Sequence, residues 1–333
     1  MRLVFPAIAL AMVGLQVHAA GQNFPGDTLA QGEQFVSTSF SMSDWHYAAD
    51  FVSDATIDTI DDTERGYENA SNKGYDFQTK ITYLIGITSD ITAGIRTGYA
   101  YQKDEASIDA SAGAELEGDW VSEGGTDLTL IGKYRLDEST SADVELQLPV
   151  CSANDLSDVC SSKFAIPENS QQEGRSGGQG DGYYQLRGAL SSHWLTETDS
   201  HWMGSLFASA TLSDDVFGQK ASAPFSYGAM FGGVFPLKQN HQWIGAITLN
   251  RMLSYSAYSV QAQTEVDYSD QSSLVLSAEY LWDFMSQFQL RPFASLALVQ
   301  QPTLEFTTNN RARVIEYTTG TKFTMGAELR ASF

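Results

Sequence analysis

The chain ends on Phe323-Thr324-Met325-Gly326-Ala327-Glu328-Leu329-Arg330-Ala331-Ser332-Phe333. In steps of two, one face of this stretch is apolar and finishes on the last residue, while the other face carries Glu328 and Arg330 among small or polar residues. Successive side chains of a β-strand point to opposite sides, so the pattern predicts a strand with one apolar and one polar face. An amphipathic edge strand of a soluble sheet shows the same alternation. A strand that closes a membrane barrel would instead cover its apolar face with lipid.

The start of the chain indicates export. Arg2 precedes an apolar run from Leu3 to Leu15, and small residues surround a cleavage point after Ala19. These features predict a secretory signal peptide at residues 1–19, followed by a short periplasmic tail at residues 20–32. The apolar run is too short for a transmembrane helix. Only helices and closed barrels satisfy their backbone groups in lipid, so a mature form in a membrane would cross it with strands.

The C-terminal stretch also carries a resemblance. A terminal Phe333 with apolar residues at alternate positions resembles the C-terminal signature of bacterial outer-membrane β-barrels, which the barrel-assembly machinery reads. The resemblance implies a location in the bacterial outer membrane. It also implies three partners, namely the assembly machinery, outer-membrane lipid and lipopolysaccharide.

The chain between its ends contains twelve strand candidates. Their connections alternate between tight polar turns and long loops, as the periplasmic turns and extracellular loops of outer-membrane barrels do. We therefore predict an all-β fold, a transmembrane antiparallel up-and-down β-barrel of about 12 strands over residues 33–333, with both termini on the short-turn side. The candidates are residues 33–47, 75–88, 91–101, 126–136, 142–150, 183–195, 202–212, 225–237, 243–253, 274–284, 288–299 and 319–333.

Aromatic residues indicate which face of the barrel meets lipid. A lipocalin-like soluble barrel has the same alternation with its apolar face inside. Aromatic rings gathered at one level of the strands are instead typical of a membrane interface. Tyr134, Trp194, Trp202, Phe235, Trp243, Trp282, Phe288 and Phe333 fall at the short-turn ends, and Tyr75, Phe77, Tyr99 and Tyr101 at the opposite ends.

With the apolar face outward, the polar face lines the lumen. Its basic residues are Lys80, Arg96, Lys133, Arg135, Arg187, Arg291, Lys322 and Arg330, and its acidic residues are Asp76, Asp127, Asp143, Glu145, Glu279 and Glu328. Two interpretations stay open. The charges either line an aqueous path that favours anionic or polar solutes, or pair into a network that fills a narrow lumen.

Composition excludes several functions. The formal net charge of −22 argues against nucleic acid as a partner. Cys151 and Cys160, separated by eight residues, predict a disulfide in an oxidising compartment rather than a metal site. Neither a metal nor a cofactor is expected. The acidic segment from Asp50 to Glu68 lacks an EF-hand pattern and is interpreted as a solvated loop, with divalent-cation binding as the alternative.

No catalytic residues are predicted, and we expect no enzyme activity. The outer-membrane phospholipase family carries a His-x-Ser pair on one strand. The nearest sequence here is Ser191-Ser192-His193, in the reverse order. An enzyme needs its catalytic groups held together. Omptin-like proteases need an Asp/His set at the extracellular rim, and His46 with Asp44 is the single candidate here.

Twelve strands, a Gly-rich loop before residue 183 and the lack of a catalytic set loosely resemble twelve-stranded transporter-type barrels. These are the barrels attached to aromatic-compound degradation and related to the fatty-acid transporters. The tail at residues 20–32 is too short to match the N-terminal hatch of those transporters. The sequence thus predicts a channel for passive uptake of small solutes through a charged lumen. The alternative is a closed structural or adhesin-like barrel that acts through its long acidic loops.

Overall fold

The computed structural model describes most of the chain after residue 26. The described residues are 27–52, 67–110, 115–150, 162–165, 173–176, 184–195, 201–211, 215–216, 219–221, 225–238, 240–259, 264–300, 304–308, 311–317 and 319–333. The predicted signal peptide at residues 1–19 and the predicted disulfide between Cys151 and Cys160 lie outside them. In the described part of the chain, no helix is long and apolar enough to cross a membrane.

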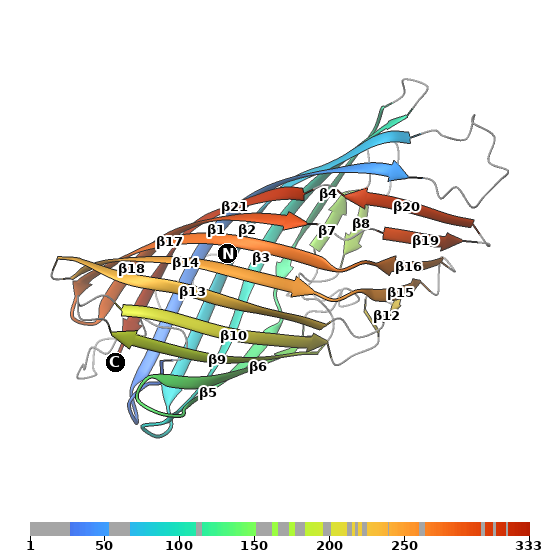
Figure 1. The fold of residues 1–333 in the computed structure, drawn as a ribbon. Coiled ribbons are helices and arrows are strands. Elements are labelled where there is room, and N and C mark those ends of the chain that lie inside the picture. The colour runs from blue at the N-terminus through green and yellow to red at the C-terminus, as the bar shows by residue number, and fades with distance from the viewer. Residues whose placement is uncertain are drawn as a thin grey trace.

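The described residues form a closed antiparallel β-barrel, which confirms the predicted all-β class and strand number (Figure 1). Closure joins the two ends of the barrel. The backbone N–H of Gln34 donates to the carbonyl of Phe333 at 3.0 Å, and the N–H of Phe333 donates back to Gln34 at 2.9 Å. The twelve barrel strands are β1 (Gln34–Val52), β2 (Tyr67–Gly86), β3 (Ile91–Ala110), β4 (Glu115–Gly125) continued by β5 (Leu128–Arg135), β6 (Thr140–Leu148), β9 (Gln185–Leu195), β10 (His201–Thr211), β13 (Phe225–Lys238), β14 (His241–Met252), β17 (Gln271–Met285), β18 (Phe288–Gln300) and β21 (Thr319–Ser332).

Shorter strands extend the wall on the long-loop side, beyond the ends that the sequence predicted. Strands β12, β15, β16, β19, β20 and β1 pair in that order, and β7 pairs with β8 in a separate hairpin. The first three barrel strands also continue well past their predicted ends. The alternating pattern stops there, because a strand outside the bilayer needs no apolar face. The shorter strands are β7 (Ser162–Ala165), β8 (Glu173–Ser176), β11 (Asp215–Val216), β12 (Gln219–Ala221), β15 (Tyr255–Ser259), β16 (Thr264–Tyr268), β19 (Leu304–Thr308) and β20 (Arg311–Tyr317).

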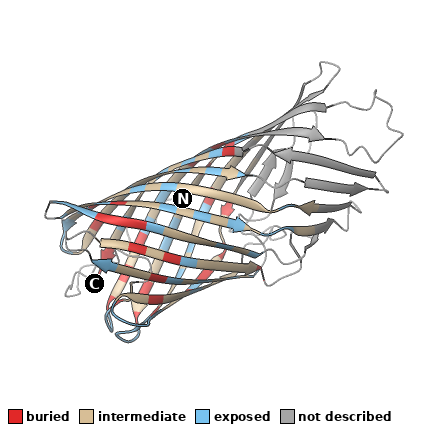
Figure 2. Cartoon of the chain, in the orientation of Figure 1, coloured by how far each residue is buried: buried red, intermediate tan, exposed pale blue. Residues whose placement is uncertain are grey.

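The barrel is apolar outside and polar inside. Leu206 is 64% exposed and Leu249 57% exposed, whereas Thr92 is fully buried and Ser191 is 2% exposed. Exposed and buried positions are interspersed along the strands (Figure 2). A soluble protein would lose about 25 cal/mol for each Å² of apolar surface left in water, so this outer face requires lipid. The soluble-barrel alternative is therefore wrong.

Aromatic rings form two groups at the two ends of the apolar outer face. On the short-turn side, Trp202 stacks on Phe231 at 5.3 Å and meets Phe235 at 5.8 Å, and Phe288 meets Phe333 at 6.5 Å between ring centroids. On the long-loop side, Tyr75 lies 5.7 Å from Phe77 and 6.1 Å from Tyr101. Amphipathic rings at two levels are typical of the two membrane interfaces.

Candidate functional site in the barrel lumen

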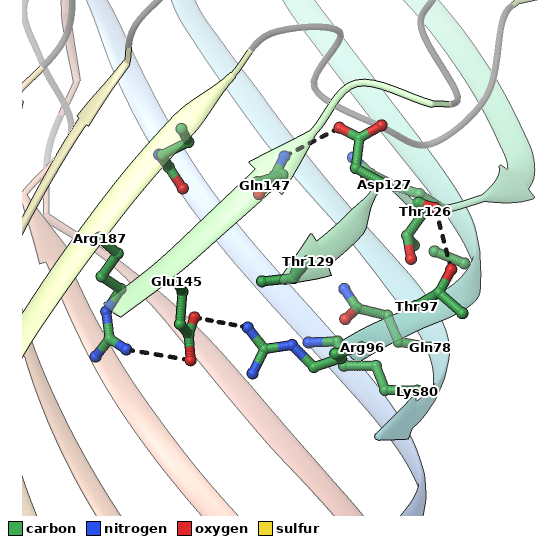
Figure 3. Close-up of a pocket in the computed structure, with 13 residues that line it drawn as sticks. Gln78, Lys80, Arg96, Thr97, Thr126, Asp127, Thr129, Glu145, Gln147 and Arg187 are labelled. Carbon is green, nitrogen blue, oxygen red and sulfur yellow. Dashed lines mark hydrogen bonds and ion pairs between the residues drawn. The ribbon is translucent and has the colours of Figure 1, made fainter. Parts of the chain in front are cut away.

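A polar cavity lies inside the barrel against the wall formed by β2, β3, β5, β6 and β9. Its volume is about 600 Å³. Strand register brings its polar residues together, because directly opposed residues of neighbouring strands share a face. Arg96 lies opposite Thr129, Thr129 opposite Gln147, and Gln147 opposite Gln185. Figure 3 shows the side chains of this wall pointing into a common space.

Glu145 is the centre of charge in this cavity. Its Oε2 accepts a hydrogen bond from the Arg96 guanidinium at 2.7 Å, and its Oε1 lies 3.7 Å from Nη1 of Arg187 (Figure 3). Arg187 also lies 5.2 Å above the ring of Phe207. Lys80 lines the same cavity and has no ion pair with any described side chain. One carboxylate therefore faces two guanidinium groups and an ammonium group. The cavity's other carboxylate, Asp127, accepts a hydrogen bond from Gln147 at 3.0 Å.

A second charged group lies nearer the short-turn end, on β17, β18 and β21. Arg291 pairs with Glu279 and lies 4.0 Å from Glu328, which in turn pairs with Arg330 at 2.8 Å. Arg330 also donates to Gln289 at 3.4 Å. The four charged side chains of this group are 11–22% exposed. The predicted network interpretation thus describes this level of the lumen, where positive and negative groups compensate one another.

The remaining predicted lumen residues do not join either group. Lys322 pairs with Asp76 at 3.0 Å and lies 5.0 Å above the ring of Trp45. Lys133 lies opposite Asp143 in the pairing of β5 with β6. Arg135 is exposed at the end of β5. Neither Lys133 nor Arg135 forms an ion pair with another described side chain.

An apolar inner wall was not expected from the sequence. Met203, Val234, Ile244 and Leu281 pack together on the inner face of β10, β13, β14 and β17, and each is at most 4% exposed. Strands β10, β13 and β14 carry apolar residues on both faces, so their alternation was weak in the sequence, whereas the alternation of β17 was clear. The lumen is thus charged on one side and apolar on part of the other.

The N-terminal tail enters the lumen, which the sequence also did not indicate. Leu29 is 1% exposed and packs with Phe35, Leu84 and Ile131. Its backbone N–H donates to the Thr92 hydroxyl at 2.7 Å. A second cavity of about 320 Å³ lies at the short-turn end and is lined in part by Phe35, Gln289 and Arg330.

The fold and lumen define the class of protein. An antiparallel barrel with an even number of strands, an apolar outer belt, two aromatic levels and a charged interior is a transmembrane β-barrel of the bacterial outer-membrane class. The protein is accordingly located in the outer membrane.

No protein-family model matches the sequence, and no curated protein matches it. Among solved structures, the chain is similar to an outer membrane channel from Pseudomonas putida F1 (TM-score 0.48, 12% identity, covering 95% of this chain and 100% of that one). It is also similar to the translocator domain of the autotransporter NalP from Neisseria meningitidis (TM-score 0.48, 8% identity, covering 91% of this chain and 90% of that one). A third similar structure is a FadL homologue of Pseudomonas aeruginosa (TM-score 0.46, 8% identity, covering 94% of this chain and 96% of that one). The functional assignment therefore rests on the residues of this chain.

Proposed function

We propose that the protein is an outer-membrane channel that passively passes small polar solutes and favours anions. The observation that carries this proposal is the charge balance of the larger cavity. Lys80, Arg96 and Arg187 outnumber Glu145 and Asp127 there, in a chain whose formal net charge is −22. Rings and walls of basic side chains favour anions in pores because they offset the cost of removing the ion from bulk water.

The positions of the two cavities support an order in which a solute would meet the charged groups. The larger cavity lies on the wall of β2 to β9, and the smaller cavity lies at the short-turn end. The Arg291–Glu279 and Arg330–Glu328 pairs belong to the level of the smaller cavity, which Arg330 also lines. A solute on this route would meet the cationic cavity before the compensated pairs. Selectivity is therefore assigned to the first group and the limit on solute size to the second.

Planar-bilayer recording tests the proposal. The purified protein is expected to give stable current steps, with a reversal potential in a KCl gradient that shows chloride preference. Arg187→Gln and Arg96→Gln should both reduce this preference. Arg251→Gln is the matched control, since Arg251 is on the outer face and 52% exposed. Equal effects of the inner and outer variants, or cation preference in the wild type, would contradict the proposal.

The second candidate is a closed barrel with a structural or surface-binding role. The compensated pairs and the buried Leu29 favour it, because both occupy space at the short-turn end of the lumen. Most of the acidic segment after β1, through which this role was expected to act, lies outside the described residues. Bilayers that stay silent with correctly folded protein would support this candidate.

The partners follow from the same proposal. Membrane lipid surrounds the apolar belt, and a small solute occupies the lumen. Contact with lipopolysaccharide and recognition of Phe333 by the assembly machinery remain predictions from the sequence.

A further inference from the structure

The larger cavity is polar to an unusual degree for a solute site. Ala100 is the one apolar residue among those that line it. Ligand sites are ordinarily lined mainly by apolar and aromatic groups, with a few polar groups that orient the ligand. A hydrocarbon or simple aromatic solute would gain little here, because it would displace water from polar groups without replacing their hydrogen bonds.

Amide groups are the second feature of this cavity. Gln78, Gln102, Gln147 and Gln185 all line it. The side-chain amides of Gln78 and Gln185 have no hydrogen-bond partner among the described residues. An amide offers both a donor and an acceptor, which suits a hydroxyl group that donates and accepts in turn.

Cationic groups with donors to spare are the third feature. Glu145 takes one short hydrogen bond from Arg96, while Arg187 approaches it only to 3.7 Å. A guanidinium has five N–H donors, so both arginines keep donors for a ligand. Lys80 forms no ion pair with a side chain in the described part of the chain. Two arginines, a lysine and four amides converge on a space of about 600 Å³.

Resting on the channel function proposed above, we infer that this cavity is a saturable binding site for a polyhydroxylated organic anion, the class to which sugar acids belong. The carboxylate of such a solute is held by Lys80 and the free edges of Arg96 and Arg187. Its hydroxyls are held by the glutamine amides. The site recognises the two kinds of group together, so a neutral sugar and an unhydroxylated acid each satisfy only half of it.

Titration calorimetry of the full chain in detergent tests this inference with three probes of similar carbon number. Galacturonate is expected to bind at least about tenfold more tightly than galactose or hexanoate, since each of these lacks one set of partners. Lys80→Gln should weaken galacturonate binding about tenfold, and Gln185→Leu should weaken it while leaving hexanoate unchanged. The matched control is Lys73→Gln, because Lys73 pairs with Glu105 at 3.1 Å and is 62% exposed.

Each outcome decides the inference. If hexanoate bound as tightly as galacturonate, the glutamine amides would not contribute to recognition. If galactose bound as tightly as galacturonate, the cationic side chains would not contribute. Absence of galacturonate binding would overturn the site as a whole. The titration needs no current, so it separates the two proposals. Chloride-selective conductance without galacturonate binding would overturn only the binding site, while silent bilayers would overturn the channel whatever the titration gives.

Discussion

Glu145 decides how much positive charge the larger cavity presents. Its side chain on β6 is 19% exposed and lies between Arg96 of β3 and Arg187 of β9. Removal of one partner from a partly buried charge group leaves the others uncompensated. The carboxylate therefore limits the anion preference that the two arginines would otherwise give.

Neutralising this carboxylate gives the first prediction. Glu145→Gln should increase chloride preference, seen as a larger shift of the reversal potential in a salt gradient, with little change in barrel assembly. Glu138→Gln is the control, because Glu138 is exposed in the turn before β6. A shift toward cation preference in Glu145→Gln would show that the arginines do not face the permeating ions.

The pair of Arg251 and Asp270 fixes the rim between β14 and β17. The Arg251 guanidinium donates to Oδ2 of Asp270 at 2.5 Å, and the backbone N–H of Ser254 donates to Oδ1 at 2.8 Å. The hydrogen bond from Arg251 has the largest effect, and with the bond from Ser254 it holds the pKa of Asp270 below its usual range. A carboxyl with a lowered pKa stabilises the folded rim above its ordinary pKa and loses this contribution as pH falls through the lowered value.

The second prediction follows from the lowered pKa of Asp270. In a carboxyl ¹³C NMR titration, Asp270 should titrate below the ordinary Asp value of about 3.9, and Arg251→Gln should return its pKa toward that value. The exposed Asp137, in the short turn between β5 and β6, serves as an internal reference, since its lowered pKa comes from Ser139 and not from an arginine. An unchanged Asp270 titration in Arg251→Gln would contradict the assignment.

At the scale of elements, the N-terminal tail depends on one glycine at the end of β2. The N–H of Gly32 donates to the carbonyl of Gly86 at 2.8 Å, and the N–H of Gly86 donates to Glu33 at 2.9 Å. A Cβ built at Gly86 would overlap the backbone of Ala30. Only glycine permits so close an approach of two backbones.

Gly86→Ala should therefore release the tail from the lumen, which is the third prediction. Exposure of Leu29 would remove about 1.5–3 kcal/mol of burial, so amide exchange at Leu29 and Gly32 should accelerate strongly while the barrel remains folded. Gly245→Ala is the control, since nothing lies within 4 Å of a Cβ there. Unchanged exchange in Gly86→Ala would show that the tail is not held at this point.

The strands were largely predictable from the sequence. Alternation located all twelve barrel strands, because lipid outside and charge inside impose opposite chemistry on neighbouring residues. It could not find the full lengths of β1, β2 and β3, since no such contrast exists beyond the bilayer. It also missed the apolar inner wall at Met203 and Ile244, where both faces of a strand are apolar.

The lumen was less predictable than the wall. Sequence patterns indicated that Arg96, Glu145 and Arg187 share a face, but not that one carboxylate lies between both arginines. Such a contact depends on the register between strands that are far apart in sequence. The position of Leu29 likewise depends on tertiary packing. The short tail has no alternating pattern from which this position could be predicted.

For the whole molecule, the reversed distribution of polar and apolar residues dominates stability. Leu276 on β17 is 45% exposed toward lipid, and the next residue, Ser277, faces the lumen and hydrogen-bonds to the carbonyl of Ala246. A charge on the lipid side has no water or partner to stabilise it, while a charge on the lumen side does.

The fourth prediction compares these neighbours. Leu276→Arg should lower the free energy of unfolding in lipid vesicles by about 2–4 kcal/mol, while Ser277→Arg should cost much less. Denaturant titrations followed by tryptophan fluorescence provide the measurement. A greater loss in Ser277→Arg would be inconsistent with lipid on the side of Leu276.

The most direct test of the central claim, lipid outside and water inside, is a spin-label scan of β17 in membranes, with Cys151 and Cys160 replaced by serine. Labels at Leu274, Leu276 and Ala278 should be relaxed by oxygen, which partitions into lipid. Labels at Val275, Ser277 and Glu279 should be relaxed by a water-soluble nickel complex. The reverse pattern of relaxation, or equal relaxation of neighbouring labels, would show that lipid does not cover the Leu276 side of β17.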